Sequence, residues 1–287
     1  MDEVYFKYLT ANKADIDWGL FVKVAGFTEN PPNAPYPLIQ HPSGYHFSWK
    51  KGRILDEYQI SYITKGQGVL ETKARSYKIT AGTAFMIVPG QWHRYKPDPS
   101  TGWDEYYVGF HGSYVSQIFE QSFFRNSGSS FLVGHNITLL NSFKDIIEKV
   151  NGEHPGYQQQ LAGRVMNILG EIVSIVKNHD FEGKEIEKRI KEAQFDIRER
   201  LDQALNLEVF AQRYNMSYSY FRKLFKTYTG LSPAQYHLQL RLQRARDLIS
   251  STDKSIKEIA FSLGFESQFH FSKIYKKKFG FSPNKTK

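Results

Sequence analysis

The chain has no cysteine among its 287 residues, so no disulfide framework can hold it together. It also lacks any apolar run that approaches the roughly 18 residues of a membrane helix. The opening residues Met1, Asp2 and Glu3 bring acidic groups where an export signal carries basic ones. We therefore expect a cytoplasmic protein that has no membrane partner.

Acidic residues fail to balance basic ones in only one part of the chain. Residues 184–287 carry 21 Lys and Arg against 11 Asp and Glu, a net charge of +10, whereas residues 1–183 carry 17 against 18, a net charge of −1. A segment with such an excess of positive charge attracts phosphate through counterion release. The division predicts two domains, of which only the second has an electrostatic reason to bind nucleic acid.

The basic segment contains one unit twice, at residues 207–233 and 255–283. Each copy has the pattern of a short helix, a tight turn, a second helix rich in basic and aromatic residues, and a Gly-x-Ser-Pro stop. Ser232 with Gln235, and Ser255 with Glu258, form capping boxes that mark helix starts. The repetition predicts two helix-turn-helix motifs. Residues 233–250 would join them as a helix of roughly 27 Å, long enough to place two reading helices in successive major grooves.

The second helix of each copy has an apolar face that would anchor it and a polar face that would remain free. Phe221, Leu224 and Phe225 recur at helical spacing, as do Phe271, Ile274 and Tyr275. The free faces carry Ser219, Arg222, Lys223 and Lys226 in the first copy and Gln268, Phe269, His270, Ser272, Lys273 and Lys276 in the second. Arg can bridge guanine and Gln can pair with adenine in a major groove. A solvated basic face is the alternative for one such helix, but repetition favours DNA binding.

The first half of the chain predicts β structure between about Tyr36 and Gly112. Short β-branched or aromatic segments alternate there with turns, at residues 59–63, 68–72, 84–88 and 105–110, which is typical of a small barrel or jelly roll. Helical spacing follows in residues 139–150 and 161–176. These two helices could pack on the barrel, pair with a second subunit, or do both. The fold class is thus α+β, with an all-α C-terminal domain.

The quoted motifs resemble the AraC/XylS family of transcription regulators. The resemblance rests on Gly230-x-Ser232-Pro233-x-x-Tyr236, Arg241-Leu242-x-x-Ala245, Ile256-x-Glu258-Ile259-Ala260 and Gly264-Phe265 followed by Phe271-Ser272-Lys273. Lys65-Gly66-Gln67-Gly68, Gly82 with Pro89-Gly90-x-x-His93, and Trp103-x-x-Tyr106-Tyr107-x-x-Phe110 resemble the cupin-like sensor of that family. It implies a sensor and dimerisation domain at residues 1–178, a linker at 179–184 and a DNA-binding domain at 185–287.

The same resemblance implies site residues. The first positions of each second helix would contact bases, which here are Ser219, Arg222, Lys223, Gln268, Phe269, His270 and Lys273. Alignment with sugar-sensing relatives places Lys51, Tyr95, Glu105 and Tyr107 at the ligand. These groups suit a hydroxyl-rich solute, because charged groups bind hydroxyls and aromatic faces stack on sugar rings. Trp49, His46 and Trp92 could line the mouth of the barrel, with His93 as a turn or pocket residue.

Cupin enzymes hold a metal with a His-x-His pair, a Glu and a later His, and no His-x-His occurs in this chain. We therefore expect no cofactor, no metal and no catalytic residues. The favoured function is a dimeric regulator, an activator of carbohydrate-utilisation genes that responds to a small sugar and acts with RNA polymerase. A cupin-type enzyme fused to a DNA-binding module, metal-dependent or sugar-isomerising, is one alternative. A ligand-independent architectural DNA binder is another.

Overall fold

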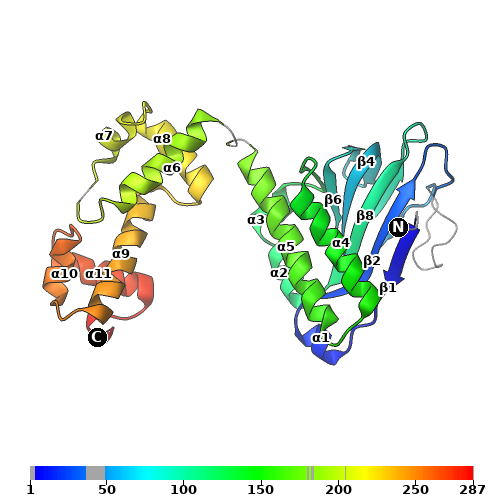
Figure 1. Ribbon diagram of the computed structural model, residues 1–287. Helices are drawn as coiled ribbons and strands as arrows, with labels where there is room; N and C mark the ends of the chain where they lie inside the picture. The colour runs from blue at the N-terminus through cyan, green and yellow to red at the C-terminus, as the bar shows by residue number, and fades with distance from the viewer. Residues whose placement is uncertain (1–3, 37–48, 180, 182–183, 204, 287) are drawn as a thin grey trace. The chain divides into compact units, whose positions relative to one another are not determined.

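The computed structural model describes residues 4–36, 49–179, 181, 184–203 and 205–286. The chain divides into two compact units, Met1–Lys177 and Asn178–Lys287. The first is rich in strands and the second is helical, which confirms the predicted mixed class (Figure 1). Within the described ranges, none of the helices is long and apolar enough to cross a membrane.

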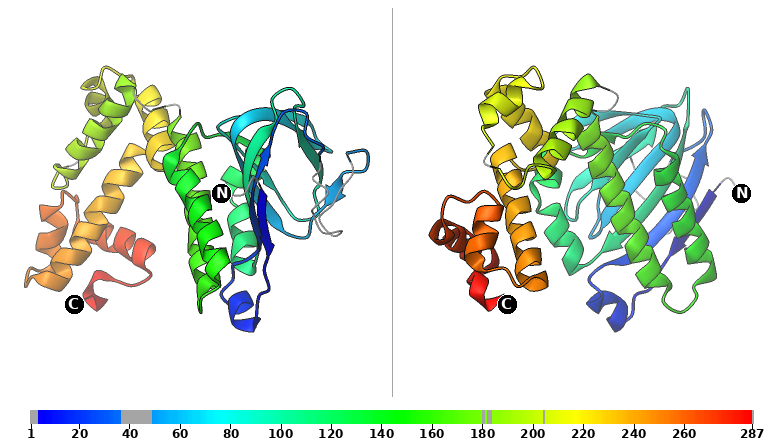
Figure 2. Two further views of the ribbon diagram at one scale, coloured as in Figure 1. Left: turned by 45° about the vertical axis from the view of Figure 1, so that its right-hand side comes forward. Right: turned by 60° about the vertical axis from the view of Figure 1, so that its left-hand side comes forward.

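The strands of the first unit form two antiparallel sheets that share one strand (Figure 2). Their bounds in the described ranges are β1 (Val4–Tyr8), β2 (Phe21–Asn30), β3 (Arg53–Ile54), β4 (Tyr58–Thr72), β5 (Ser76–Thr80), β6 (Thr83–Ile87), β7 (Trp92–Pro97), β8 (Trp103–His111) and β9 (Ser130–Leu132). The first sheet has the order β1-β2-β8-β4-β6-β9, and the second has the order β5-β4-β7-β3. The sheet thus begins at Val4, well before the predicted start near Tyr36.

β4 is one bent strand where the sequence predicted two strands and a turn. Its first half pairs with β6 and β8, and its second half pairs with β5 and β7. The register shifts between Ile63 and Lys65, and Gly66 follows with a φ of +76°. A Cβ on Gly66 would collide with the carbonyl oxygen of Gly102. The predicted turn at Lys65–Gly68 is therefore wrong, because glycine here bends a continuous strand from one sheet into the other.

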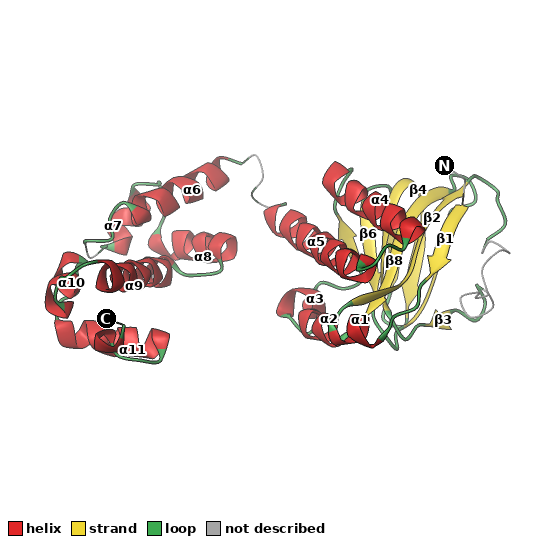
Figure 3. Ribbon diagram, turned by 60° about the horizontal axis from the view of Figure 1, so that its bottom comes forward, coloured by secondary structure: helices red, strands yellow, loops and turns green. Residues whose placement is uncertain are grey.

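Two long helices cover the outer face of the first sheet (Figure 3). They are α4 (Ile137–Gly152) and α5 (Tyr157–Asn178), and both were predicted. Leu139, Phe143 and Ile168 are fully buried against the sheet, so packing on it is confirmed and pairing with a second subunit stays a prediction. Shorter helices accompany them at α1 (Lys13–Asp17), α2 (Ser113–Phe119) and α3 (Ser122–Asn126).

The second unit consists of two small cores joined by one long helix. Its helices are α6 (Glu185–Arg198), α7 (Leu207–Gln212), α8 (Tyr218–Thr229), α9 (Pro233–Ser251), α10 (Ile256–Ser262) and α11 (Gln268–Phe279), followed by a short 3₁₀ turn at Pro283–Lys285. The capping boxes predicted at Ser232 and Ser255 are both present. Gly230 and Gly280 end α8 and α11 with φ near +81° and +84°, the left-handed conformation that glycine adopts without strain.

The bend in β4 can be tested with a pair of glycine substitutions. Gly66→Ala must adopt a left-handed backbone and also displace the Gly102 carbonyl, whereas Gly90→Ala at a similar φ of +77° meets no atom within 4 Å. We expect Gly90→Ala to lower the free energy of unfolding by about 1 kcal/mol and Gly66→Ala by at least about 2 kcal/mol more. Tryptophan fluorescence during denaturant unfolding measures this, because all four tryptophans lie in the first unit. Equal losses would contradict the collision.

Candidate functional site

Four of the predicted ligand residues meet between the two sheets of the first unit. His93 and Tyr95 lie on β7, and Glu105 and Tyr107 lie on β8. Residues two apart on a strand share a face, and all four of these are buried. Glu105 and Tyr95 are close enough for each charge to act on the pKa of Tyr107. The sequence prediction therefore identified one polar cluster, hereafter the inner cluster.

Arg53 is the central donor of the inner cluster, and sequence reasoning missed it. Its Nη2 donates to the Tyr95 hydroxyl at 2.8 Å, and its Nε donates to Nε2 of His93 at 3.2 Å. Gln59 donates through Nε2 to the Tyr95 hydroxyl at 3.1 Å and to Oγ of Ser61 at 3.0 Å. These bonds tie β3 and β7 of the second sheet to β4 of the first.

The inner cluster is polar but carries little fixed charge apart from Arg53. Burial raises the pKa of Glu105 to about 7, although the Ser61 hydroxyl and the Arg53 guanidinium both oppose this rise. Burial also lowers the pKa of His93 to about 4, with the Arg53 charge acting in the same direction and the Gln91 carbonyl against it. Burial raises the pKa of Tyr95 to about 12. At neutral pH the cluster therefore holds a neutral imidazole and a carboxyl group near its titration midpoint.

Several buried polar atoms beside this cluster make no hydrogen bond to any described residue. They are Oε1 of Glu105, the Tyr107 hydroxyl, the Trp103 indole N–H and both amide atoms of Asn30. The Tyr107 ring fits there because it crosses β2 at Gly26, where any Cβ would overlap the phenol. An unsatisfied buried polar atom costs about 1–3 kcal/mol. A ligand rich in hydroxyl groups, or ordered water, would remove that cost.

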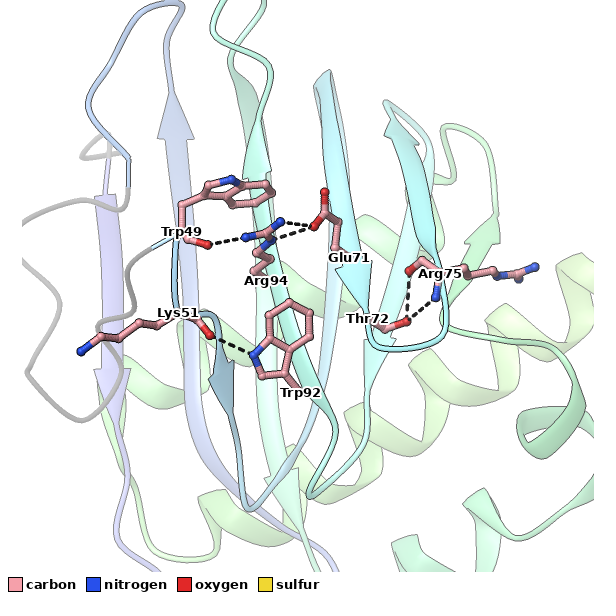
Figure 4. A network of polar contacts seen from close by, with 7 residues as sticks. All are labelled: Trp49, Lys51, Glu71, Thr72, Arg75, Trp92 and Arg94. Carbon is pink, nitrogen blue, oxygen red and sulfur yellow. Dashed lines mark hydrogen bonds and ion pairs between the residues drawn. The ribbon is translucent and has the colours of Figure 1, made fainter.

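The predicted residues Trp49 and Lys51 take part in a different set of polar contacts, with Arg94 and Trp92 (Figure 4). The Trp49 ring stacks on the guanidinium of Arg94 at 4.3 Å, and Arg94 alternates with His93 and so points from the opposite face of β7. Arg94 also pairs with Glu71 at 2.6 Å and donates to the Trp49 carbonyl at 2.8 Å.

The backbone carbonyl of Lys51 accepts a hydrogen bond from the Trp92 indole at 2.9 Å. The exposed side chain of Lys51 points away from the contacts of Trp49, Arg94 and Glu71 (Figure 4). Trp49, Trp92, Glu71 and Arg94 therefore form a second network, hereafter the outer group. The place of Trp49 and Trp92 at the mouth of the barrel stays a prediction. His46 lies outside the described residues.

His93 is occupied by protein contacts. Besides the Arg53 bond, its Nδ1 lies 2.9 Å from the carbonyl oxygen of Gln91. Across the described ranges, no three His, Cys, Asp or Glu side chains gather as metal ligands.

The reading faces predicted for the second unit are exposed in α8 and α11. Phe221 and Phe225 are fully buried, as are Phe271 and Tyr275, which fixes the orientation of each helix. The solvent-exposed residues on the opposite faces are Ser219, Arg222, Lys223 and Lys226 of α8 and Gln268, Phe269, His270, Lys273 and Lys276 of α11, with Ser272 half-buried. Their exposure agrees with the sequence pattern, while their contact with DNA stays a prediction.

α9 belongs to both cores of the second unit and so holds the two helix pairs together (Figure 3). Tyr236 packs with α8, whereas Leu242 and Ile249 pack with α10 and α11. Between these contacts, the guanidinium of Arg241 lies 3.9 Å from the centroid of the Phe265 ring. Because both pairs are anchored to one helix, their spacing is set by the fold and not by a flexible linker.

Comparison with known proteins matches both units. The family model "AraC-like ligand binding domain" matches residues 33–169, and the model "Helix-turn-helix domain" matches residues 210–287. The chain is 29% identical over 253 residues to the Msm operon regulatory protein of Streptococcus mutans, covering 84% of this chain and 87% of that protein.

Two further relatives are named as activators. The chain is 25% identical to the transcriptional activator RhaS of Escherichia fergusonii, covering 79% of this chain and 84% of the relative. It is 24% identical to the lactose operon transcription activator of Staphylococcus xylosus, covering 83% and 85%.

The raised pKa of Glu105 predicts how stability depends on pH. Between pH 4.5 and 7 the folded carboxyl keeps its proton while the unfolded one loses it, so stability should fall as pH rises through this window and level off above it. The full contribution is about 3 kcal/mol. Glu105→Gln, which cannot ionise, should gain stability relative to wild type by this amount between pH 4.5 and pH 8. Unfolding followed by tryptophan fluorescence at each pH measures it, and a constant difference would show that Glu105 titrates normally.

Proposed function

Because the chain belongs to the AraC/XylS family of transcription regulators, we propose that a sugar-like effector bound at the inner cluster controls how its two helix pairs read an operator. The coarser description already holds: it is a DNA-binding regulator that carries a ligand-binding domain. The proposal adds the class of effector, the residues of both sites and the direction of control.

The effector we propose is a small, neutral, hydroxyl-rich molecule. The observation that supports this class of effector is a set of buried polar atoms that have no hydrogen-bond partner among the described residues. They belong to Glu105, Tyr107, Trp103 and Asn30. Arg53, Gln59 and Tyr95 would donate and accept beside them, with His93 orienting Arg53. A strongly charged ligand fits less well, because Glu105 is near its midpoint and Arg53 is already engaged. The relative that is named for a lactose operon supports the sugar class.

The two sheets would be a cupin-like jelly roll, and α7–α8 and α10–α11 would be two helix-turn-helix motifs. Residues 1–178 would form the sensor, 179–184 the linker and 185–287 the DNA-binding domain, consistent with a division of the chain at Lys177 and Asn178. The α8 and α11 residues identified above would enter adjacent major grooves.

We further propose a homodimer that activates transcription with RNA polymerase, since two relatives are named as activators. The enzyme alternative draws no support from these relatives, all three of which are named as regulators or activators.

The reading helices can be tested by removing one amide or guanidinium from each. Arg222→Ala and Gln268→Ala should each weaken operator binding by about 1–3 kcal/mol while leaving affinity for random DNA nearly unchanged. Lys188→Ala is the control, because it removes an exposed charge from α6, which is not one of the two reading helices. Fluorescence anisotropy with both DNAs across a salt series gives the numbers. Equal losses on operator and random DNA would reassign the two residues to phosphate contacts and favour an architectural binder.

The effector site can be tested by removing one carboxylate from the inner cluster, that of Glu105, and one from the outer group, that of Glu71. Thermal stabilisation by a panel of monosaccharides and disaccharides identifies the effector, since a ligand at a hundred times its Kd adds about 2.7 kcal/mol. Glu105→Ala should abolish this stabilisation and the transcriptional response while leaving DNA affinity intact. Glu71→Ala, which removes a carboxylate of the outer group, should respond like wild type. The opposite pattern would move the site to the outer group, and normal binding by both variants would refute the inner cluster.

A further inference from the structure

The second reading helix presents an aromatic ring to solvent where the first presents a small polar residue. Phe269 is 80% exposed, more than any other large hydrophobic residue in the described ranges. The apolar contacts of α11 come instead from Phe271 and Tyr275, which are fully buried. A phenyl ring that packs in no core is available to contact another molecule, and burying it there is favourable because its exposure to water is unfavourable.

The position of Phe269 places its ring on the proposed DNA-contacting face. It is the second residue of α11 and lies two residues after Ser267, whose side chain caps the helix by accepting from the His270 N–H at 3.1 Å. Lys273 follows one helical turn later and is exposed on the same side. If Lys273 and Lys276 approach DNA, the Phe269 ring approaches it too.

A phenyl ring can recognise only one feature of a major groove. Guanine, adenine and cytosine present donors and acceptors there, and a phenyl ring can satisfy none of them. Thymine alone offers a methyl group, which is an apolar partner. A phenyl ring placed against any other base would displace water from its polar edge without replacing the lost hydrogen bonds. Phe269 therefore also disfavours guanine, adenine and cytosine at this position.

The matching position in the first helix has different chemistry. Ser219 and Phe269 each lie two residues before the first buried phenylalanine of their helix, Phe221 and Phe271. α8 therefore has a hydroxyl there, with the guanidinium of Arg222 three residues later, whereas α11 has a phenyl ring, with the amide of Gln268 one residue earlier. Arg favours guanine and Gln favours adenine. The side chains of α8 and α11 therefore favour different bases.

We propose that Phe269 reads the C5-methyl group of thymine, so that the half-site under α11 contains A·T pairs and the half-site under α8 contains guanine. This inference rests on the proposed function, in which both helices enter major grooves. It makes the operator unsymmetrical within one subunit and gives the chain a defined direction on DNA.

The test removes the methyl group from the DNA and the ring from the protein in turn. An operator is first selected from a random-sequence DNA pool with the full-length wild-type protein. Each thymine is then replaced singly by deoxyuridine, which lacks only the methyl group. Wild type should lose about threefold to tenfold in affinity at one or two thymines of a single half-site. Phe269→Ala should bind the thymine and uracil forms of those positions equally.

Two variants control the experiment. Phe269→Leu keeps an apolar group and should retain a preference for thymine over uracil, whereas Lys188→Ala on α6, outside both reading helices, should leave the wild-type pattern unchanged. Equal uracil losses in wild type and Phe269→Ala would overturn the inference. So would an unaltered affinity of Phe269→Ala for the selected operator, which would indicate that the ring binds another protein. Failure of wild type to select any sequence would instead refute the proposed function, so the two failures are distinct.

Discussion

Burial of the Glu105 carboxyl group between two sheets is the constraint on which the first unit depends. A carboxyl there can remain only if β8 is covered on both faces, and α4 and α5 supply that cover on the outer side. A buried carboxyl group also requires polar neighbours, and those of Glu105 include Arg53, Gln59 and Tyr95. The cluster still leaves polar atoms without partners in the described ranges, so it is not arranged for stability alone. In the function we propose, the bound effector would satisfy these polar atoms and so offset the cost.

The second unit depends on a simpler rule, which is that buried aromatic residues decide the orientation of α8 and α11, the two proposed reading helices. Phe221 and Phe225 turn one face of α8 inward, and Phe271 and Tyr275 do the same for α11. Each face that remains free is the one that carries the cations and amides. α9 then joins both cores, so that the relation between the free faces is a property of the folded unit. Specific reading of two half-sites needs this rigidity, since a mobile pair would lose affinity to ordering.

The helical unit was the easier part to predict, because its signals are local. Capping boxes at Ser232 and Ser255 and terminal glycines at Gly230 and Gly280 act within a single turn of chain. The β unit depends on distant pairing, so β1 and β2 were missed and β4 was divided in two. Gln59 and Ser61 show why the site was only partly predicted. Their alternation with apolar residues is typical of a solvent face, yet both are buried, because the second sheet covers that face.

Arg53 was beyond the reach of sequence patterns for a related reason, and its position bears on regulation. It belongs to a two-residue strand that pairs only with β7 in the described ranges, whereas Tyr95, Glu105 and Tyr107 lie on strands paired at both edges. An effector can shift a conformational equilibrium only through unequal affinity for the two states. Contacts to the rigid strands contribute affinity that is nearly equal in both states. Within the inner cluster Arg53 lies on the shortest strand, which is paired at one edge in the described ranges, so we expect this residue to contribute most of the unequal affinity.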